Sequence, residues 1–218
     1  MKKRPFIAAC LLFFFVFICP IFSFAEELKP IQLLKPQLDG GRPLMQVLND
    51  RKSSREFSPE KLPIQVLSNL LWAASGINRP DSGRRTAPSA VNWQEIDIYV
   101  AAADGLYLYE VEAHSLKPVL AEDIRAMTGR QAFVKEAPVN LIYVADFSKM
   151  GKATNEDKDF FSAADTGFVA QNVYLYCASE GLATVVRAHI DKPALAKVMG
   201  LRPDQKITLS QTVGYPKK

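Results

Sequence analysis

Hydrophobic positions along the chain follow two periods, one typical of helices and one typical of strands. Residues 62–76 begin with a leucine-proline pair, repeat apolar side chains at helical spacing and end at a glycine, which predicts an amphipathic helix. Residues 96–100 alternate as a half-buried strand does, and an Asp-Gly turn then leads into a second apolar segment at 106–111. This pattern predicts a β-hairpin.

Helices and strands also interleave in the second half of the chain. The polar segment 77–88 predicts a loop. The pattern then predicts a helix near 119–128, a buried central strand at 139–145, a long helix at 163–180, an extended segment at 184–186, a short helix at 191–200 and a last strand at 207–213. Interleaved elements together with a hairpin predict an α+β fold with a central mixed or antiparallel sheet flanked by helices.

The N-terminus carries the pattern of an export signal. Three basic residues at 2–4 precede an apolar run at 6–24, and small residues at 23–25 stand before two glutamates. We therefore expect residues 1–25 to be a cleaved signal peptide and the protein to be periplasmic or secreted. An uncleaved membrane anchor is the alternative, since the run approaches the length of a bilayer span. Residues 26–45 predict an extended arm that wraps a partner subunit or tethers the chain, and residues 46–218 predict one domain.

Composition excludes several classes of protein. The formal net charge is +4 with scattered basic residues, so nothing indicates a nucleic-acid partner. Cys177 is the only cysteine after the signal, which excludes an intramolecular disulfide and predicts a buried structural thiol. His114 and His189 lack partners at ligand spacing, so we expect no metal site.

A short cationic stretch at residues 51–55 combines Arg51, Lys52, Ser53 and Arg55. In an extended segment, alternate side chains point to the same side, so Arg51, Ser53 and Arg55 could form a phosphate clamp. The alternative is a solvated surface segment.

A second segment, at residues 88–94, combines small side chains with two amides. It contains Pro88, Ser89, Ala90, Asn92 and Gln94. Small residues let the backbone approach a planar ring, and the amides offer both hydrogen-bond donors and acceptors. The alternative is an ordinary connecting loop.

These two segments belong to an ordered set of motifs. The others are Gly129-Arg130-Gln131 before Ala137-Pro138, the segment 167–172 with Gln171-Asn172, Gly181-Leu182 and Gly214-Tyr215-Pro216. In this order the set resembles the nitroreductase-like family of FMN-dependent oxidoreductases, nearest the azoline dehydrogenase-like branch. The resemblance covers about residues 46–218.

The resemblance implies a nitroreductase-like fold and an intertwined homodimer with two FMN sites at the subunit interface. It places Arg51, Lys52, Ser53 and Arg55 at the phosphate, ribityl and pyrimidine edge, and Gln131 at the pyrimidine. It implies that Pro88, Ser89, Ala90, Asn92 and Gln94 reach the flavin from the partner subunit. Lys217 matches a position that often contacts the phosphate.

The resemblance also places Arg187, Ala188 and His189 in the loop that passes the central flavin ring. Classical nitroreductases have a Glu-Gly pair near Ala188 and His189, so this chain departs from their pattern. His189 is the candidate catalytic side chain, because an imidazole beside a flavin can donate a proton or orient a substrate. The alternative is a structural histidine at a loop corner.

The sequence therefore predicts an exported FMN-dependent oxidoreductase that transfers hydride or electrons through flavin N5, in a ping-pong mechanism, to or from a small organic substrate. The donor stays open between NAD(P)H and another reductant, because an exported enzyme has little access to NAD(P)H. The alternative function is a non-catalytic FMN-binding or flavin-carrier protein.

Overall fold

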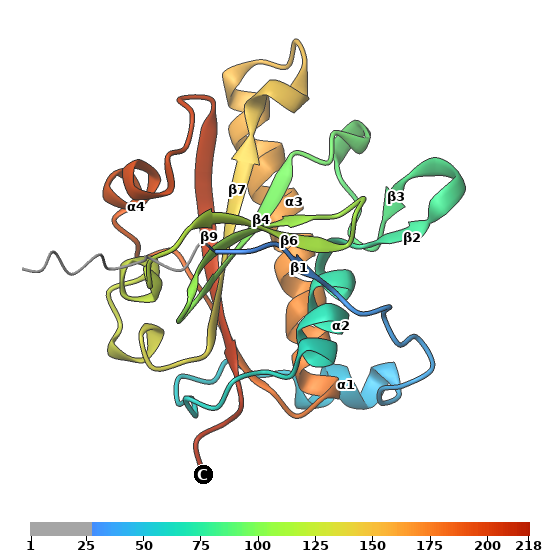
Figure 1. Ribbon diagram of the computed structural model, residues 1–218. Helices are drawn as coiled ribbons and strands as arrows, with labels where there is room; N and C mark the ends of the chain where they lie inside the picture. Colours follow the sequence, from blue (N-terminus) through green and yellow to red (C-terminus); the bar gives the residue numbers. More distant parts are fainter. Residues whose placement is uncertain (1–27) are drawn as a thin grey trace, which may run out of the picture.

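The computed structural model describes residues 28–218, and the predicted signal at 1–25 lies outside them. Its regular elements begin at the N-terminal arm and end near the C-terminus (Figure 1). They are β1 (Ile31–Gln32), α1 (Leu44–Asp50), α2 (Ile64–Ser75), β2 (Ile77–Arg79), β3 (Arg84–Arg85), β4 (Ile96–Ala102), β5 (Gly105–Glu110), β6 (Ser115–Leu120), β7 (Val139–Asp146), α3 (Asn155–Ser179), β8 (Ala183–Arg187), α4 (Lys192–Met199) and β9 (Gln205–Gly214).

Seven of the strands form one sheet in the order β1-β6-β5-β4-β7-β9-β8. Every neighbouring pair in this sheet is antiparallel. All eight residues of β7 are buried, as expected for the apolar segment predicted to be a central strand. The edge strand β8 borders the candidate site described below.

Alternate residues of the central strands pack against opposite layers of helix, as the two-residue period of a strand requires. Val100 of β4 and Leu141 of β7 join the core cluster that contains α2 and α3 residues. Tyr99 of β4 and Ile142 of β7 join the cluster that contains Leu195 of α4. The sheet is thus covered by α2 and α3 on one face and by α4 on the other (Figure 1).

The long helix α3 begins eight residues before the predicted start at residue 163. Thr154 caps its first turn by accepting a hydrogen bond from the backbone N–H of Asp157 at 3.1 Å. Glu156 and Asp157 place negative charge at the positive end of the helix dipole. The first turns are polar and therefore lack the apolar period on which the prediction depended.

The helix predicted near residues 119–128 is wrong. Val119 and Leu120 belong to β6, where Leu120 pairs with Leu106 of β5. Residues Arg125–Thr128 form only one 3-10 turn. The antiparallel pairing of residues 115–120 with β5 decides the structure of this segment.

Two short pieces of strand lie in segments predicted to be irregular. Strands β2 and β3 form a small hairpin inside the loop predicted at 77–88. In the arm, β1 pairs with β6 of the same chain, and α1 begins at Leu44. The domain boundary at residue 46 stays a prediction. No helix within residues 28–218 is long and apolar enough to span a bilayer.

Candidate functional site

The cationic stretch at residues 51–55 runs beside the edge strand β8. The backbone N–H of Ser54 donates to the carbonyl of Thr184 at 2.9 Å. Two residues beyond the stretch, Phe57 forms an isolated β-bridge with Pro216. The edge of β8 and the C-terminal segment therefore hold the predicted phosphate clamp in place.

Tyr174 of α3 joins this stretch to β8, a role that the sequence did not reveal. Its hydroxyl lies 2.8 Å from the Ser53 hydroxyl and accepts a hydrogen bond from the Val186 N–H at 3.0 Å. The Arg51 guanidinium lies 5.2 Å from the centre of the tyrosine ring, which is within cation–π range. A tyrosine inside an apolar helix gives no signal of such a contact.

The charges of this stretch are not neutralised by ion pairs within the described part of the chain. Lys52, Ser53 and Arg55 are exposed, and Arg51 is half-buried. Among residues 28–218, none of the ion pairs involves Arg51, Lys52 or Arg55. Three unneutralised cations and a hydroxyl on one short segment favour the binding of an anion.

The segment Gly129-Arg130-Gln131 lies against the C-terminal end of β8. The Arg130 N–H donates to the His189 carbonyl at 3.3 Å. A Cβ atom at Gly129 would lie 1.8 Å from Nη1 of Arg187 and 2.8 Å from Oε1 of Gln131, so only glycine fits here. Oε1 of Gln131 is buried and has no hydrogen-bond donor among the described residues. A buried acceptor of this kind is expected to bind a donor from outside the chain.

Arg187 points its side chain into the protein core. The guanidinium donates to the Thr128 carbonyl at 2.6 Å, to Asn140 Oδ1 at 2.9 Å and to Thr212 Oγ1 at 2.8 Å. Burial lowers the pKa of Arg187 to about 10. The side chain thus ties β8 to β7 and β9, while its Nε is buried and has no hydrogen-bond acceptor among the described residues.

Ala188 and His189 follow at the surface, and both are exposed. His189 lies at a loop corner and no hydrogen bond of its ring is found within residues 28–218. The ring is accessible to a ligand bound at the end of β8. The catalytic and the structural readings of His189 therefore both stay open at this point.

The loop at residues 88–94 has a strained backbone. Val91, Asn92 and Gln94 have φ values of 50°, 59° and 51°. A positive φ is an outlier for the β-branched Val91, and such strain often accompanies functional loops. Ser89 Oγ accepts from the Gln94 N–H at 3.0 Å, and the Gln94 amide donates to Gly83 at 3.1 Å. The amide of Gln94 is therefore already used to hold the loop.

Within one protomer, this loop lies away from the cationic stretch. The Ala90 N–H donates to Asp165 Oδ2 at 2.8 Å, whereas the cationic stretch contacts Tyr174. Asp165 and Tyr174 are nine positions apart on α3. At 3.6 residues per turn, they are about 13 Å apart along the axis and on roughly opposite sides of the helix. The chain thus brings 51–55, 129–131 and 187–189 together, but not 88–94.

Glu95, which the sequence reasoning missed, lies directly after this loop. Its side chain is fully buried, and neither carboxyl oxygen has a hydrogen-bond donor within the described chain. Burial, together with the nearby carboxyl of Asp165, raises the pKa of Glu95 to about 7. The neighbouring Asp165 in turn anchors Ala90.

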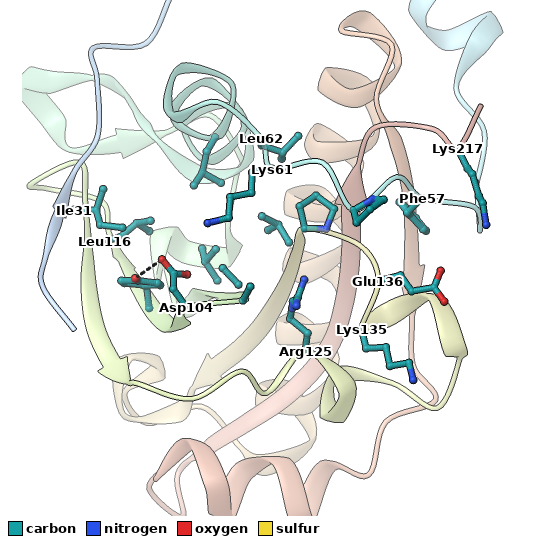
Figure 2. Close-up of a pocket in the computed structure, with 18 residues that line it drawn as sticks. Ile31, Phe57, Lys61, Leu62, Asp104, Leu116, Arg125, Lys135, Glu136 and Lys217 are labelled. Carbon is teal, nitrogen blue, oxygen red and sulfur yellow. Dashed lines mark hydrogen bonds between the residues drawn. The ribbon is translucent and has the colours of Figure 1, made fainter. Parts of the chain in front are cut away.

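Lys217, the remaining predicted residue, is exposed next to the chain that leaves the cationic stretch. Its backbone N–H donates to the Glu56 carbonyl at 3.4 Å. It also borders a cavity of about 580 Å³, which Figure 2 shows between Phe57, Lys61 and Asp104. No other predicted site residue lines this cavity, so the cavity is separate from the surface at the end of β8.

Comparisons with known proteins identify the family of the chain. The model of the nitroreductase family matches residues 48–215. A Methanocaldococcus jannaschii protein described as a candidate nitroreductase is 34% identical over 152 residues, 65% of this chain and 76% of that protein.

Solved structures share the fold. A candidate nitroreductase from Ralstonia eutropha superposes with a TM-score of 0.83 at 46% identity, covering 87% of this chain and 90% of that chain. A Desulfovibrio desulfuricans structure solved in complex with FMN has a TM-score of 0.59 at 23% identity, covering 81% and 88%. The second structure, at its low identity, supports the fold alone. The predicted fold class is confirmed.

Proposed function

The chain belongs to the nitroreductase family of FMN-dependent oxidoreductases, and from this premise we propose that it is an exported enzyme whose FMN lies at the end of β8. The observation that carries the proposal is that the same edge strand holds an unneutralised cationic stretch beside Thr184 and, near its C-terminal end, the unpaired buried acceptor of Gln131. Neither feature is satisfied within the described chain.

The residues present fit FMN. Its phosphate is an anion, for which Arg51, Lys52 and Ser53 supply charge and a hydroxyl. Its pyrimidine carries an N–H that suits the free Oε1 of Gln131. Arg55 is exposed on the same segment and can stabilise negative charge at the pyrimidine edge. When bound, FMN supplies hydride and electron transfer in two half-reactions at one site.

The residues of the chain itself bind the FMN, orient it and adjust its reactivity. Tyr174 fixes Ser53 and the Val186 N–H, so the phosphate clamp and the strand share one support. The buried Arg187 fixes the end of β8 from inside, and the next two residues, Ala188 and His189, lie at the surface. His189, exposed there, is positioned to hold a proton for a substrate.

A second copy completes the site. The loop at 88–94 lies on the opposite side of α3 from the cationic stretch, so one protomer does not surround a flavin. Exposed apolar side chains occur on helices α1 and α3, which pack against each other. They are Leu44, Met45, Leu48, Phe160 and Phe168. An apolar face of this kind favours a symmetric homodimer in which the loop of one protomer reaches the flavin of the other.

Export and the electron donor complete the proposal. The basic and apolar pattern of residues 1–25 supports a periplasmic or secreted protein. The direct donor is then NAD(P)H or a reductant available outside the cytoplasm, such as a quinol. The finer resemblance to the azoline dehydrogenase-like branch stays a prediction from the motif set.

The absorbance spectrum of the purified protein with added FMN, before and after anaerobic NADPH, tests the proposed function. We expect a yellow protein whose flavin is bleached by NADPH or by a quinol. Bleaching by dithionite alone would favour the flavin-carrier function. A colourless protein that does not take up FMN would overturn both.

A further inference from the structure

The cavity bordered by Lys217 lies at the open end of the main core. It is enclosed by Ile31 of the arm, by the segment before α2, and by the sheet face that α2 covers. Its volume of about 580 Å³ is in the range of small-molecule sites. Of the residues that we place at the flavin, only Lys217 touches it.

The inner wall of the cavity is apolar. The side chains that line it continue the core cluster between the sheet and α2. They are Leu62, Leu67, Val100, Tyr107, Leu116 and Val139. An apolar wall of this extent favours a ligand with an apolar body, because burial of its surface stabilises the complex.

The polar lining is cationic on balance. Lys61 and Arg125 point into the cavity, where Asp104 also lies, whereas Lys135, Glu136 and Lys217 stand at one edge and point away from it (Figure 2). Two cations and one acid leave an excess of one positive charge. This excess favours a ligand that carries negative charge.

Lys61 and Arg125 are placed to bind that charge. Figure 2 shows Lys61 and Arg125 pointing into the cavity from opposite sides. Within residues 28–218, Lys61 has no ion pair or side-chain hydrogen bond. Arg125 is held in position by Asp123 at 2.7 Å and by the Ala137 carbonyl at 2.9 Å. The free amino group of Lys61 is thus the main anchor, and the oriented guanidinium of Arg125 supports it.

We propose that this cavity binds a small amphipathic organic anion, with its carboxylate or sulfonate at Lys61 and Arg125 and its apolar body against the core wall. Asp104, whose carboxylate accepts from the Tyr107 hydroxyl at 3.2 Å, lies on the same side of the cavity as Lys61 (Figure 2). The site is distinct from the flavin site and does not require the proposed function.

Calorimetric titration of the purified protein, with and without FMN, tests this site. The probes are octanoate, 1-naphthoate and the uncharged octan-1-ol. Octanoate and 1-naphthoate distinguish an alkyl from an aromatic apolar body, and octan-1-ol shows how much of the affinity depends on the negative charge. We expect at least one of the two anions to bind at one per chain and at least about tenfold more tightly than the alcohol, about 1.4 kcal/mol. Equal affinity for the alcohol, or no binding of either anion, would overturn the proposal.

Substitutions in and outside the cavity test whether the anion binds there. Lys61→Met keeps the length of the side chain but removes the charge, and we expect at least a fivefold loss of anion affinity. The matched control is Lys152→Met, an exposed lysine outside the cavity, which should leave affinity unchanged. Ala102→Leu fills the cavity from β4 and should abolish binding of both anions. Equal affinity in all three variants and the parent protein would overturn the site.

Discussion

At the scale of single residues, the buried Glu95 links the loop at 88–94 to pH. Its pKa of about 7 lies above the ordinary value of 4.5. The folded chain therefore holds an extra proton between these two values, and the free energy of unfolding falls as pH rises through this window. The loss is complete only above about pH 8, at about 3 kcal/mol.

Glu95→Gln should remove most of this dependence. The amide donates to Asp165 as the protonated acid does, so the variant should be more stable than the parent at pH 8 and similar at pH 5. Urea unfolding between pH 5 and 8 measures the difference, with the exposed Glu60→Gln as the matched control. An equally steep pH dependence in Glu95→Gln would contradict this account of Glu95.

Cys177 offers a second residue-scale prediction. The thiol is fully buried, as the sequence predicted, and burial raises its pKa well above the ordinary value. A thiol that is both inaccessible and protonated reacts slowly. In protein from residue 26 onward, a thiol reagent should label Cys177 only when the chain is unfolded in denaturant. Rapid stoichiometric labelling of the folded protein would show that α3 opens readily at this position.

At the scale of elements, α3 has two different roles on two sides. Its buried side packs on the sheet and holds Asp165 under the loop, while Tyr174 supports the cationic stretch. Phe160 and Phe168 remain exposed, at 68% and 47%. Exposed phenylalanines on a long helix are best explained by a partner helix.

Phe168→Glu should therefore weaken the dimer, because it would bury a charge at the proposed interface. We expect the dimer dissociation constant to rise by more than about tenfold, with a parallel loss of FMN. Light scattering coupled to size exclusion measures the mass, and Val198→Glu on α4 is the matched control, since Val198 is exposed elsewhere. A dimer of unchanged stability would place the interface on another surface.

The same elements show what could be predicted from the sequence. The hairpin of β4 and β5, the buried β7 and the C-terminal end of α3 follow patterns that are local in sequence, whereas the role of Gln131 was implied only by the family resemblance. The true start of α3 was missed because its first turns are polar and are stabilised by the Thr154 cap. They therefore lack the apolar periodicity on which the prediction depended. Tyr174 and Glu95 were missed because their roles depend on the packing of α3 against distant segments, which no local pattern encodes.

At the scale of the whole molecule, the central claim is that two protomers share each FMN site. One protomer supplies Arg51 to Arg55, Gln131 and the end of β8, and the other supplies the strained loop at 88–94. The claim rests on the placement of these two groups on opposite sides of α3. It explains why the loop is held open at the surface, with Val91 83% exposed.

The direct measurement is the FMN content of a heterodimer made from two defective chains. One chain carries Arg51→Ala and Arg55→Ala, and the other carries Asn92→Ala and Pro88→Gly, each with a different affinity tag. At an FMN concentration where both variant homodimers stay empty, the doubly purified heterodimer should bind about one FMN, because one of its two sites is intact. A heterodimer as empty as the two homodimers would contradict a site shared between protomers.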